Sequence, residues 1–193
     1  MNKKGFTLIE LLAVIVILCI TISIVVVQVE KNIKDTNEFS NEFKIKSIED
    51  AAVLYVEEHR NELTNINEKK VDTISVDTLI NSGLLSRKNL SDINPESIVL
   101  VAEINNFIKV KYTGEKKNII FLNGPSEVTL YIGDEYKEMG AYVAIPGTGV
   151  IELKSSYINS KVNTDVAGKY NVTYSYPSEP YTSPVRRIVS VIN

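Results

Sequence analysis

The first part of the chain is a long run of apolar residues. From Phe6 to Val27 the only charged side chain is Glu10. In a helix, at about 1.5 Å per residue, such a run spans roughly 33 Å, which is enough to cross the hydrocarbon core of a bilayer. We therefore predict a transmembrane helix segment over residues 6–29.

The helical pattern continues beyond this segment. No glycine occurs between Gly5 and Gly83, and no proline occurs before Pro95, so nothing in between should break a helix. The sequence predicts one helix over residues 6–62. In its second half, apolar residues recur every three or four positions and predict one buried face. These residues are Ile45, Ile48, Ala52, Tyr55, Val56, His59 and Leu63.

The segment that follows is polar and then changes to a two-residue period. A short helix is expected between Ser75, a helix-start residue, and Gly83, a helix-end residue. Apolar and polar residues then alternate over 98–104 and over 107–112, separated by Asn105-Asn106, which suits a tight turn. Only two strands are predicted for this sheet. A long helix packed on a small antiparallel sheet is an α+β fold, expected over residues 30–118.

Composition changes after Gly114, where most of the prolines and glycines lie. The segment 114–117 is predicted to be a linker or turn. Short alternating segments follow: Val128, Leu130 and Ile132 share one face, and Val189 and Val191 share another. Tyr170, Val172, Tyr174 and Tyr176 form a third such face. Short strands separated by turn signals predict an all-β sandwich over residues 119–193.

Charge narrows the choice of partners. The chain has 21 basic and 24 acidic residues, a formal net charge of −3, so we predict no direct binding of nucleic acid. The basic pairs Lys69-Lys70, Lys116-Lys117 and Arg186-Arg187 are scattered, and we expect them at solvated strand or loop ends. Lys3 and Lys4 favour a cytoplasmic N-terminus, which places the bulk of the protein outside the cell.

The residues that could carry chemistry are few. With one histidine, His59, and one cysteine, Cys19 in the apolar run, no nucleophile–base pair is evident. We predict no enzyme activity, no catalytic residue, no cofactor and no metal site. Asp134 and Glu135 are expected in a polar turn, because a calcium site needs about six or more oxygen ligands. Tyr170, Tyr174 and Tyr176 are expected either to form an adhesive face or to pack in the core.

Glu10 is the residue that a plain membrane anchor does not explain. An ionisable group in a membrane segment is unfavourable and is normally functional, so it should have a partner. If the chain is cut between Gly5 and Phe6, the new Phe6 amine is a cation one helical turn from Glu10. We therefore treat Gly5 and Phe6 as candidate processing residues and Glu10 as a candidate assembly residue.

The residues Gly5-Phe6-Thr7-Leu8-Ile9-Glu10-Leu11-Leu12 resemble the N-terminal signature of type IV prepilins and pseudopilins. The resemblance implies a leader over residues 1–5, cleavage after Gly5 by a prepilin peptidase, and methylation of the Phe6 amine. It also implies that Glu10 pairs with the N-terminus of a neighbouring pilin subunit as a filament grows. Many pilins have a proline about twenty residues into the mature helix, where this chain has Ile24-Val25-Val26-Val27, so their helix kink is not implied here.

A second resemblance covers the C-terminal part. Gly133-Asp134-Glu135-Tyr136, Gly140-Ala141 and the stretch from Gly168 to Tyr174 resemble bacterial immunoglobulin-like domains of surface proteins. Asp165 to Tyr170 resembles their tyrosine corner, in which a tyrosine hydroxyl binds an upstream backbone carbonyl. The segment Ala144-Ile145-Pro146-Gly147 departs from the acidic consensus of the family, so no binding residue is carried over.

Together the patterns predict a structural subunit of a type IV pilus or pseudopilus, expected to be a minor or tip-associated one. It would be a single-pass membrane protein before assembly and extracellular afterwards, and its C-terminal domain would bind a surface or protein ligand. The alternative is a membrane-anchored immunoglobulin-like adhesin that does not polymerise. Competence, secretion, motility and adhesion systems all remain open as the machine that uses it.

Overall fold

The computed structural model describes residues 38, 40–178 and 183–193. The leader over 1–5, the segment over 6–29 and the residues Gly5, Phe6 and Glu10 lie outside this part, so the predictions for them stay predictions. The chain divides into two compact units, residues 1–44 and 45–193, and the account below concerns the second. Among the residues described, no helix is both long and apolar enough to span a membrane.

An α-helix over 40–59 leads into the second unit. It is followed by a 3-10 turn, η1 (Arg60–Glu62), and by the short helix α2 (Thr64–Lys69). Ile48, Ala52 and Val56 are fully buried, as the periodicity predicted. His59 stacks on Tyr55 with ring centroids 4.2 Å apart, so it is a packed residue. The described part of the predicted helix is therefore helical up to residue 59, and its last three residues wind more tightly.

Three antiparallel strands form the head sheet, in the order β1-β2-β3. The predicted hairpin is confirmed as β2 (Ile98–Ile104) and β3 (Phe107–Gly114). Its turn residues Asn105 and Asn106 have φ angles of 53° and 66°, the positive values that a two-residue hairpin turn requires. The prediction of only two strands was wrong. The third strand, β1 (Val71–Ser75), is short and half polar, and its pairing with β2 makes it a strand.

The predicted short helix is α3 (Val76–Asn81), which starts directly after β1. The Ser75 hydroxyl accepts a hydrogen bond from the Thr78 backbone N–H at 3.1 Å and caps the helix. Gly83 follows with a φ of 79°, a left-handed conformation that favours glycine after a helix. A second 3-10 turn, η2 (Arg87–Leu90), then leads toward β2.

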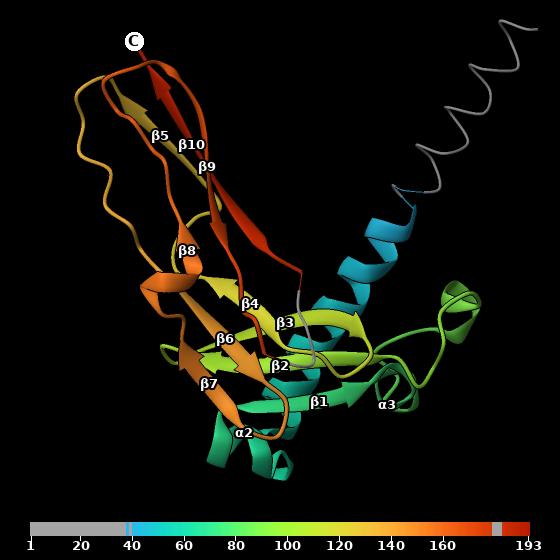
Figure 1. The fold of residues 1–193 in the computed structure, drawn as a ribbon. Helices are drawn as coiled ribbons and strands as arrows, with labels where there is room; N and C mark the ends of the chain where they lie inside the picture. Colours follow the sequence, from blue (N-terminus) through green and yellow to red (C-terminus); the bar gives the residue numbers. More distant parts are fainter. Residues whose placement is uncertain (1–37, 39, 179–182) are drawn as a thin grey trace, which may run out of the picture. The chain divides into compact units, whose positions relative to one another are not determined.

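One face of the head sheet packs against the long helix (Figure 1). Val99 and Val101 of β2 contribute to this core, and both are fully buried. From β3, Ile108, Val110 and Tyr112 pack against its margin, while Phe107, Lys109 and Lys111 are exposed on the other face. The buried members of this core are Ile48, Ala51, Ala52, Val56, Ile66, Ile74, Val76, Leu79, Leu90, Val99 and Val101.

The C-terminal part forms two sheets. The first contains β4 (Ile119–Leu122), β6 (Ala141–Ile145) and β7 (Gly149–Glu152) in the order β4-β6-β7. The second has the order β5-β10-β9-β8, and β5 pairs with β10 in parallel. Its strands are β5 (Glu127–Tyr131), β8 (Ile158–Asn159), β9 (Gly168–Tyr174) and β10 (Val185–Ile192), and the 3-10 turn η3 (Ser155–Tyr157) precedes β8. The two sheets form the predicted β-sandwich.

The core between these sheets shows where two of the tyrosines of this region lie. Tyr174 is fully buried with Val143, Val172 and Val189, so it belongs to the core and not to an adhesive face. The Tyr170 hydroxyl donates to the Val166 carbonyl at 2.9 Å, which confirms the predicted tyrosine corner. Ile132 was expected in a strand, but β5 ends at Tyr131 and the Ile132 side chain is 47% exposed.

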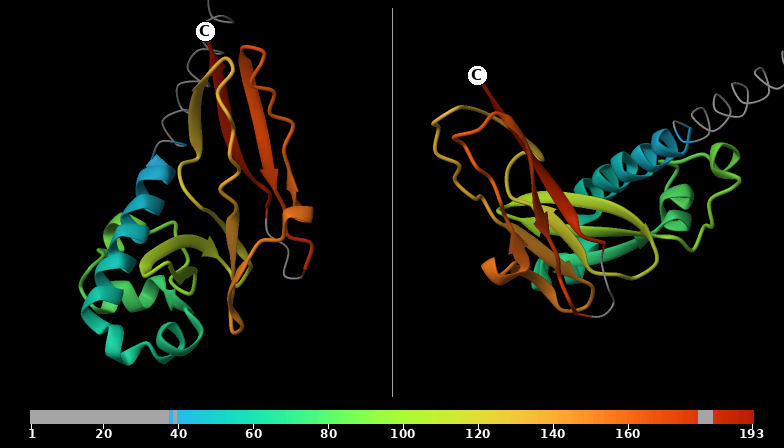
Figure 2. Two further views of the ribbon diagram at one scale, coloured as in Figure 1. Left: turned by 90° about the vertical axis from the view of Figure 1, so that its left-hand side faces the viewer. Right: turned by 45° about the horizontal axis from the view of Figure 1, so that its top comes forward.

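The head sheet and the sandwich are packed together. Alternate residues of β2, namely Leu100, Ala102 and Ile104, point away from the long helix and are buried in a separate apolar cluster. This cluster also contains residues of β4, β6 and β7, so the head sheet lies between the helix and the β4-β6-β7 sheet (Figure 2). The predicted linker or turn over 114–117 overlaps the connection between β3 and β4, residues 115–118, but this connection does not separate two independent modules.

We expect the cluster between the head and the sandwich to stabilise both. Leu100→Ala removes side-chain atoms that are 1% exposed and should lower the free energy of unfolding by about 2–5 kcal/mol. Leu54→Ala, on the long helix at 50% exposure, is the matched control and should change it by less than about 0.5 kcal/mol. Chemical denaturation of the full chain in mild detergent measures both. Equal effects of the two substitutions would contradict the buried position of Leu100.

Candidate functional site

In the described residues, the head and the sandwich meet in an extended apolar cluster. We call this cluster the junction. Its buried members are Val71, Leu100, Ala102 and Ile104 from the head and Ala144 from β6. Ile119, Phe121, Tyr142 and Val150 pack against them and are partly buried. Because the side chains are apolar and excluded from water, their burial stabilises the contact without a directional bond. The junction therefore fixes how the sandwich is held on the head.

Close backbone approach occurs at the edge of the junction. Gly149 has a φ of 136°, and a Cβ atom placed on it would lie 2.9 Å from the Lys69 carbonyl oxygen. No ordinary side chain fits there, so a glycine is required for β7 to approach α2. The Lys69 Nζ donates to the Gly147 carbonyl at 3.1 Å, and the Tyr142 hydroxyl donates to Asn105 Oδ1 at 3.4 Å.

A buried carboxylate organises the head beside the junction. The Glu103 side chain is 6% exposed and pairs with Lys70 Nζ at 2.7 Å and with Arg60. The hydrogen bond from Lys70 lowers the pKa of Glu103; desolvation opposes this, and Arg60 adds to the lowering. Glu103 N–H also donates to the Lys70 carbonyl at 2.8 Å. These contacts tie η1, the end of α2 and β2 together.

A second polar cluster lies inside the sandwich. Arg187 was expected at a solvated strand end, but it is completely buried in β10. A buried guanidinium must have its N–H groups satisfied and its charge compensated. Arg187 donates to Glu138 Oε1 at 2.9 Å and to the Tyr174 hydroxyl at 2.6 Å. Its remaining bonds go to the carbonyl oxygens of Pro125 at 3.0 Å and Asn123 at 2.5 Å.

Glu138 is the anion of this cluster. Its carboxylate accepts hydrogen bonds from the hydroxyls of Tyr136 and Tyr174 and from the Gly140 N–H. Desolvation pushes the pKa of Glu138 up, but these bonds and the charge of Arg187 outweigh it and hold the pKa below its usual range. Burial, reinforced by Glu138, raises the pKa of Tyr174. Every group is used within the fold, so the cluster is structural and offers no free reactive atom.

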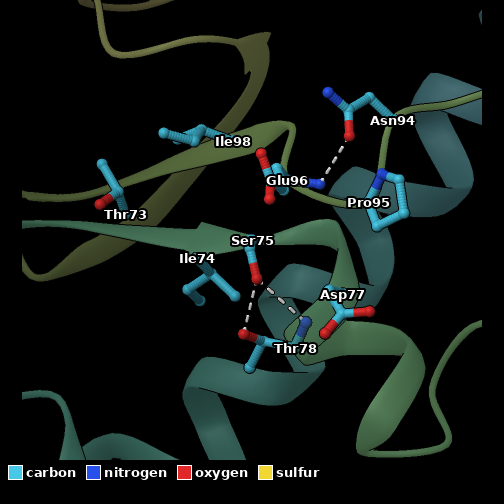
Figure 3. Close-up of a pocket in the computed structure, with 9 residues that line it drawn as sticks. All are labelled: Thr73, Ile74, Ser75, Asp77, Thr78, Asn94, Pro95, Glu96 and Ile98. Carbon is cyan, nitrogen blue, oxygen red and sulfur yellow. Dashed lines mark hydrogen bonds between the residues drawn. The ribbon is translucent and has the colours of Figure 1, made fainter.

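A groove of about 740 Å³ lies where β1 meets α3 (Figure 3). Two of the polar groups that line it already serve the local backbone: Ser75 caps α3, and Asn94 Oδ1 accepts from the Glu96 N–H at 3.0 Å. Two carboxylates, Asp77 and Glu96, stand in the lining, but no aromatic or cationic side chain accompanies them. The groove therefore shows no arrangement that identifies a ligand.

The polar turn with Asp134 and Glu135 is held by a hydrogen bond to the local backbone. Asp134 Oδ2 accepts a hydrogen bond from the Tyr131 backbone N–H at 2.8 Å, which closes the turn after β5. Within the described ranges, no group of three or more His, Cys, Asp or Glu residues is placed to hold a metal ion.

Comparisons with known proteins match both ends of the chain. Residues 1–26 match the family described as prokaryotic N-terminal methylation motif, and residues 120–191 match the bacterial surface protein Ig-like domain. The chain carries both modules. The first match includes Gly5, Phe6 and Glu10, and the second begins within β4 and ends within β10. No curated protein matches this chain.

Among solved structures, the chain is similar to the lipoprotein BT2262 from Bacteroides thetaiotaomicron. The sequences are 24% identical over the shared part, and the TM-score is 0.32. The similarity covers 38% of this chain and 37% of the lipoprotein, so this chain spans well under half of the length of the lipoprotein.

The junction was not found by sequence reasoning. The one available signal was β2 itself, because Ile98–Ile104 is apolar at every position except Glu103, as in a strand covered on both faces. The alternation of residues over 98–104 predicts only one buried face. Nothing in the local sequence singles out Gly149 or Arg187, because their environments come from segments far away in the chain.

Gly149→Ala should weaken the junction. The added Cβ atom collides with the Lys69 carbonyl, whereas Gly147→Ala, in the same turn and also at positive φ, meets no atom within 4 Å. Gly147→Ala is therefore the control for backbone strain alone. We expect Gly149→Ala to lower the melting temperature more and to speed tryptic cleavage at Lys116 and Lys117. Equal cleavage rates in the two variants would show that close approach at Gly149 is unimportant.

Glu138→Gln should destabilise the sandwich near neutral pH by roughly 1–3 kcal/mol, because it leaves Arg187 buried without a full counter-charge. Since the folded-state pKa of Glu138 is lowered, its contribution is present above its unfolded pKa of about 4.3 and is lost as the pH falls through the folded value. Wild type and variant should therefore converge in acid. The exposed Glu152→Gln is the control. Denaturation curves between pH 7 and pH 3 test this; a pH-independent difference would refute it.

Proposed function

We propose that this chain is a structural subunit of a type IV pilus or pseudopilus that displays an immunoglobulin-like domain on its surface. The observation that carries the proposal is the prokaryotic N-terminal methylation motif over residues 1–26, with Glu10 as the single charge in the apolar run. The domains proposed are a leader over 1–5, a membrane segment over 6–29, a head over 30–118 and the sandwich over 119–193.

The proposed mechanism is electrostatic. The leader keeps the N-terminus blocked, and a prepilin peptidase that cuts after Gly5 exposes the Phe6 amine as a cation. When a subunit joins, its Glu10 meets the Phe6 amine of a neighbour among packed apolar helices. The low dielectric strengthens that attraction, and an unpaired carboxylate there is costly, so the pair selects the correct register. The chain is a single-pass membrane protein before this step and extracellular after it.

The junction adds a mechanical element to this function. A domain tethered by a flexible linker would sample many orientations on the filament. Here the apolar cluster around Leu100 and Ile104, with the close approach at Gly149, holds the sandwich against the head in one orientation. A fixed orientation suits a module that must present one surface outward in a regular array. The ligand of the sandwich is proposed to be a cell surface or a protein.

The second candidate function is an anchored adhesin that never polymerises. Its membrane helix would be only an anchor, and the same sandwich would bind its target from the cell surface. The surface family matched by residues 120–191 favours this candidate as much as the first. The two differ in what Glu10 does, because an anchor has no use for a carboxylate in its apolar face.

Glu10→Val separates the two functions. In the native host, the filament function predicts that the variant inserts and is trimmed to begin at Phe6, but that filaments containing it are lost. The anchor function predicts that Glu10→Val changes neither the insertion of the chain nor its display on the cell surface. Glu30→Val, the same substitution beyond the apolar run, is the control. Mass spectrometry of the N-terminal peptide and recovery of sheared filaments measure the outcome; wild-type chains that all still begin with Met1 would refute the filament function.

A further inference from the structure

Half of the large apolar side chains that are exposed in the described residues lie at one end of the sandwich. Tyr131 is 61% exposed, Ile132 47%, Val166 53% and Ile192 41%. We call these four residues the β5–β10 patch. It lies where β5 and β10 end, at the far end of the sandwich from β7 (Figure 1).

Backbone hydrogen bonds place the segments that carry the patch side by side. Tyr131 is the register partner of Ile192, and the Ile132 N–H donates to the Ile192 carbonyl at 3.0 Å. The Gly133 N–H donates to the Thr164 carbonyl at 3.0 Å, which brings the loop that carries Val166 beside the same turn. Exposed apolar side chains that gather at one end of a folded domain commonly mark an interaction site.

The charges around the patch indicate what kind of partner fits. Asp134, Glu135 and Asp165 are exposed carboxylates on the same segments, and Lys169 is the one cation on residues 131–135, 164–169 and 190–193. This acidic rim disfavours an anionic lipid surface or a nucleic acid. It favours a protein surface with an apolar centre and basic neighbours.

The chain itself has such a surface on β3. Phe107 is 69% exposed, and Lys109 and Lys111 follow it on the same face of the strand. Lys111 Nζ lies 3.2 Å from Glu49, whereas Lys109 makes no ion pair with any described residue. We call these three residues the β3 face. It offers an aromatic side chain with a free positive charge beside it, which complements the β5–β10 patch.

We propose that the β5–β10 patch of one copy docks on the β3 face of a second copy. Two different surfaces in contact make a heterologous interface, which repeats along a filament instead of closing a pair. Four partly exposed side chains cannot reach the roughly 800 Å² per partner of a stable isolated interface. The contact should therefore form only where subunits are already held side by side, at high effective concentration. The junction supports it, because a sandwich held in one orientation always presents the patch in the same direction.

This inference rests on the proposed filament function and goes beyond it, since it requires copies of this chain to be neighbours. In this respect it departs from the expectation of a minor or tip-associated subunit. A carbodiimide reagent, which joins touching carboxylates and amines, tests it on filaments sheared from the native host. We expect a covalent dimer whose cross-linked peptide joins Lys109 to Glu135 or Asp165. Lys109→Glu should lower the yield of this dimer by roughly tenfold or more, since it removes the amine that reacts and brings like charges together. A double variant that carries both Asp165→Lys and Lys109→Glu should restore the dimer. Its cross-link should again join residues 165 and 109, but with the amine now on residue 165 and the carboxylate on residue 109.

Lys154→Glu, an exposed cation elsewhere on the sandwich, is the control and should leave the dimer unchanged. Two outcomes in filaments whose chains begin at Phe6 would overturn the inference and leave the filament function standing. One is a dimer cross-linked through other residues, and the other is no dimer at all. Material without trimmed chains or filaments would overturn the filament function, and with it this inference.

Discussion

The described structure depends on the burial of β2 on both of its faces. Val99 and Val101 pack against the long helix, while Leu100, Ala102 and Ile104 pack against the sandwich. A strand that is covered on both sides cannot lose either cover without exposing apolar area to water. The helix, the head sheet and the sandwich are therefore coupled through one strand. This coupling holds although the family match over residues 120–191 includes the sandwich and not the head sheet.

Polar interactions specify the details of this arrangement. Glu103 pairs with Arg60 and Lys70 at the head, and Glu138 pairs with Arg187 inside the sandwich. Each is a carboxylate that is at least partly buried and is paired with a cation from a distant segment of the chain. Buried charges of this kind add little net stability, but a missing partner is costly. They fix the positions of segments that the apolar cores alone would leave free to shift.

These features suit the proposed place of the chain in a filament. A pilus subunit is held by its N-terminal helix and meets its surroundings through its outer domain. The junction joins the sandwich to the head without a flexible linker, so the orientation of the sandwich follows that of the head. The β5–β10 patch lies at the other end of the sandwich and is available for contact with a neighbour.

Several elements could be predicted from the sequence because their signals are local. The helical period around Ile48 and Val56, the Asn105-Asn106 turn and the cap at Ser75 each depend on residues a few positions apart. The tyrosine corner at Tyr170 is equally local, since its partner is Val166. The N-terminal motif that includes Gly5 is a contiguous signature, and the family comparison also matches it.

The remaining features needed the fold. The strand β1 forms because β2 offers it a pairing edge, and its own sequence is too short and too polar to indicate a strand. Arg187 is buried because Glu138, in the loop before β6, and Tyr174, in β9, meet it from 49 and 13 residues away in the chain. Gly149 is required because its φ is 136° and the Lys69 carbonyl lies beside it. The sequence by itself determined the local conformations and the N-terminal methylation motif. The tertiary structure alone decided which surfaces meet, because contacts between distant segments leave no periodic signal in the chain.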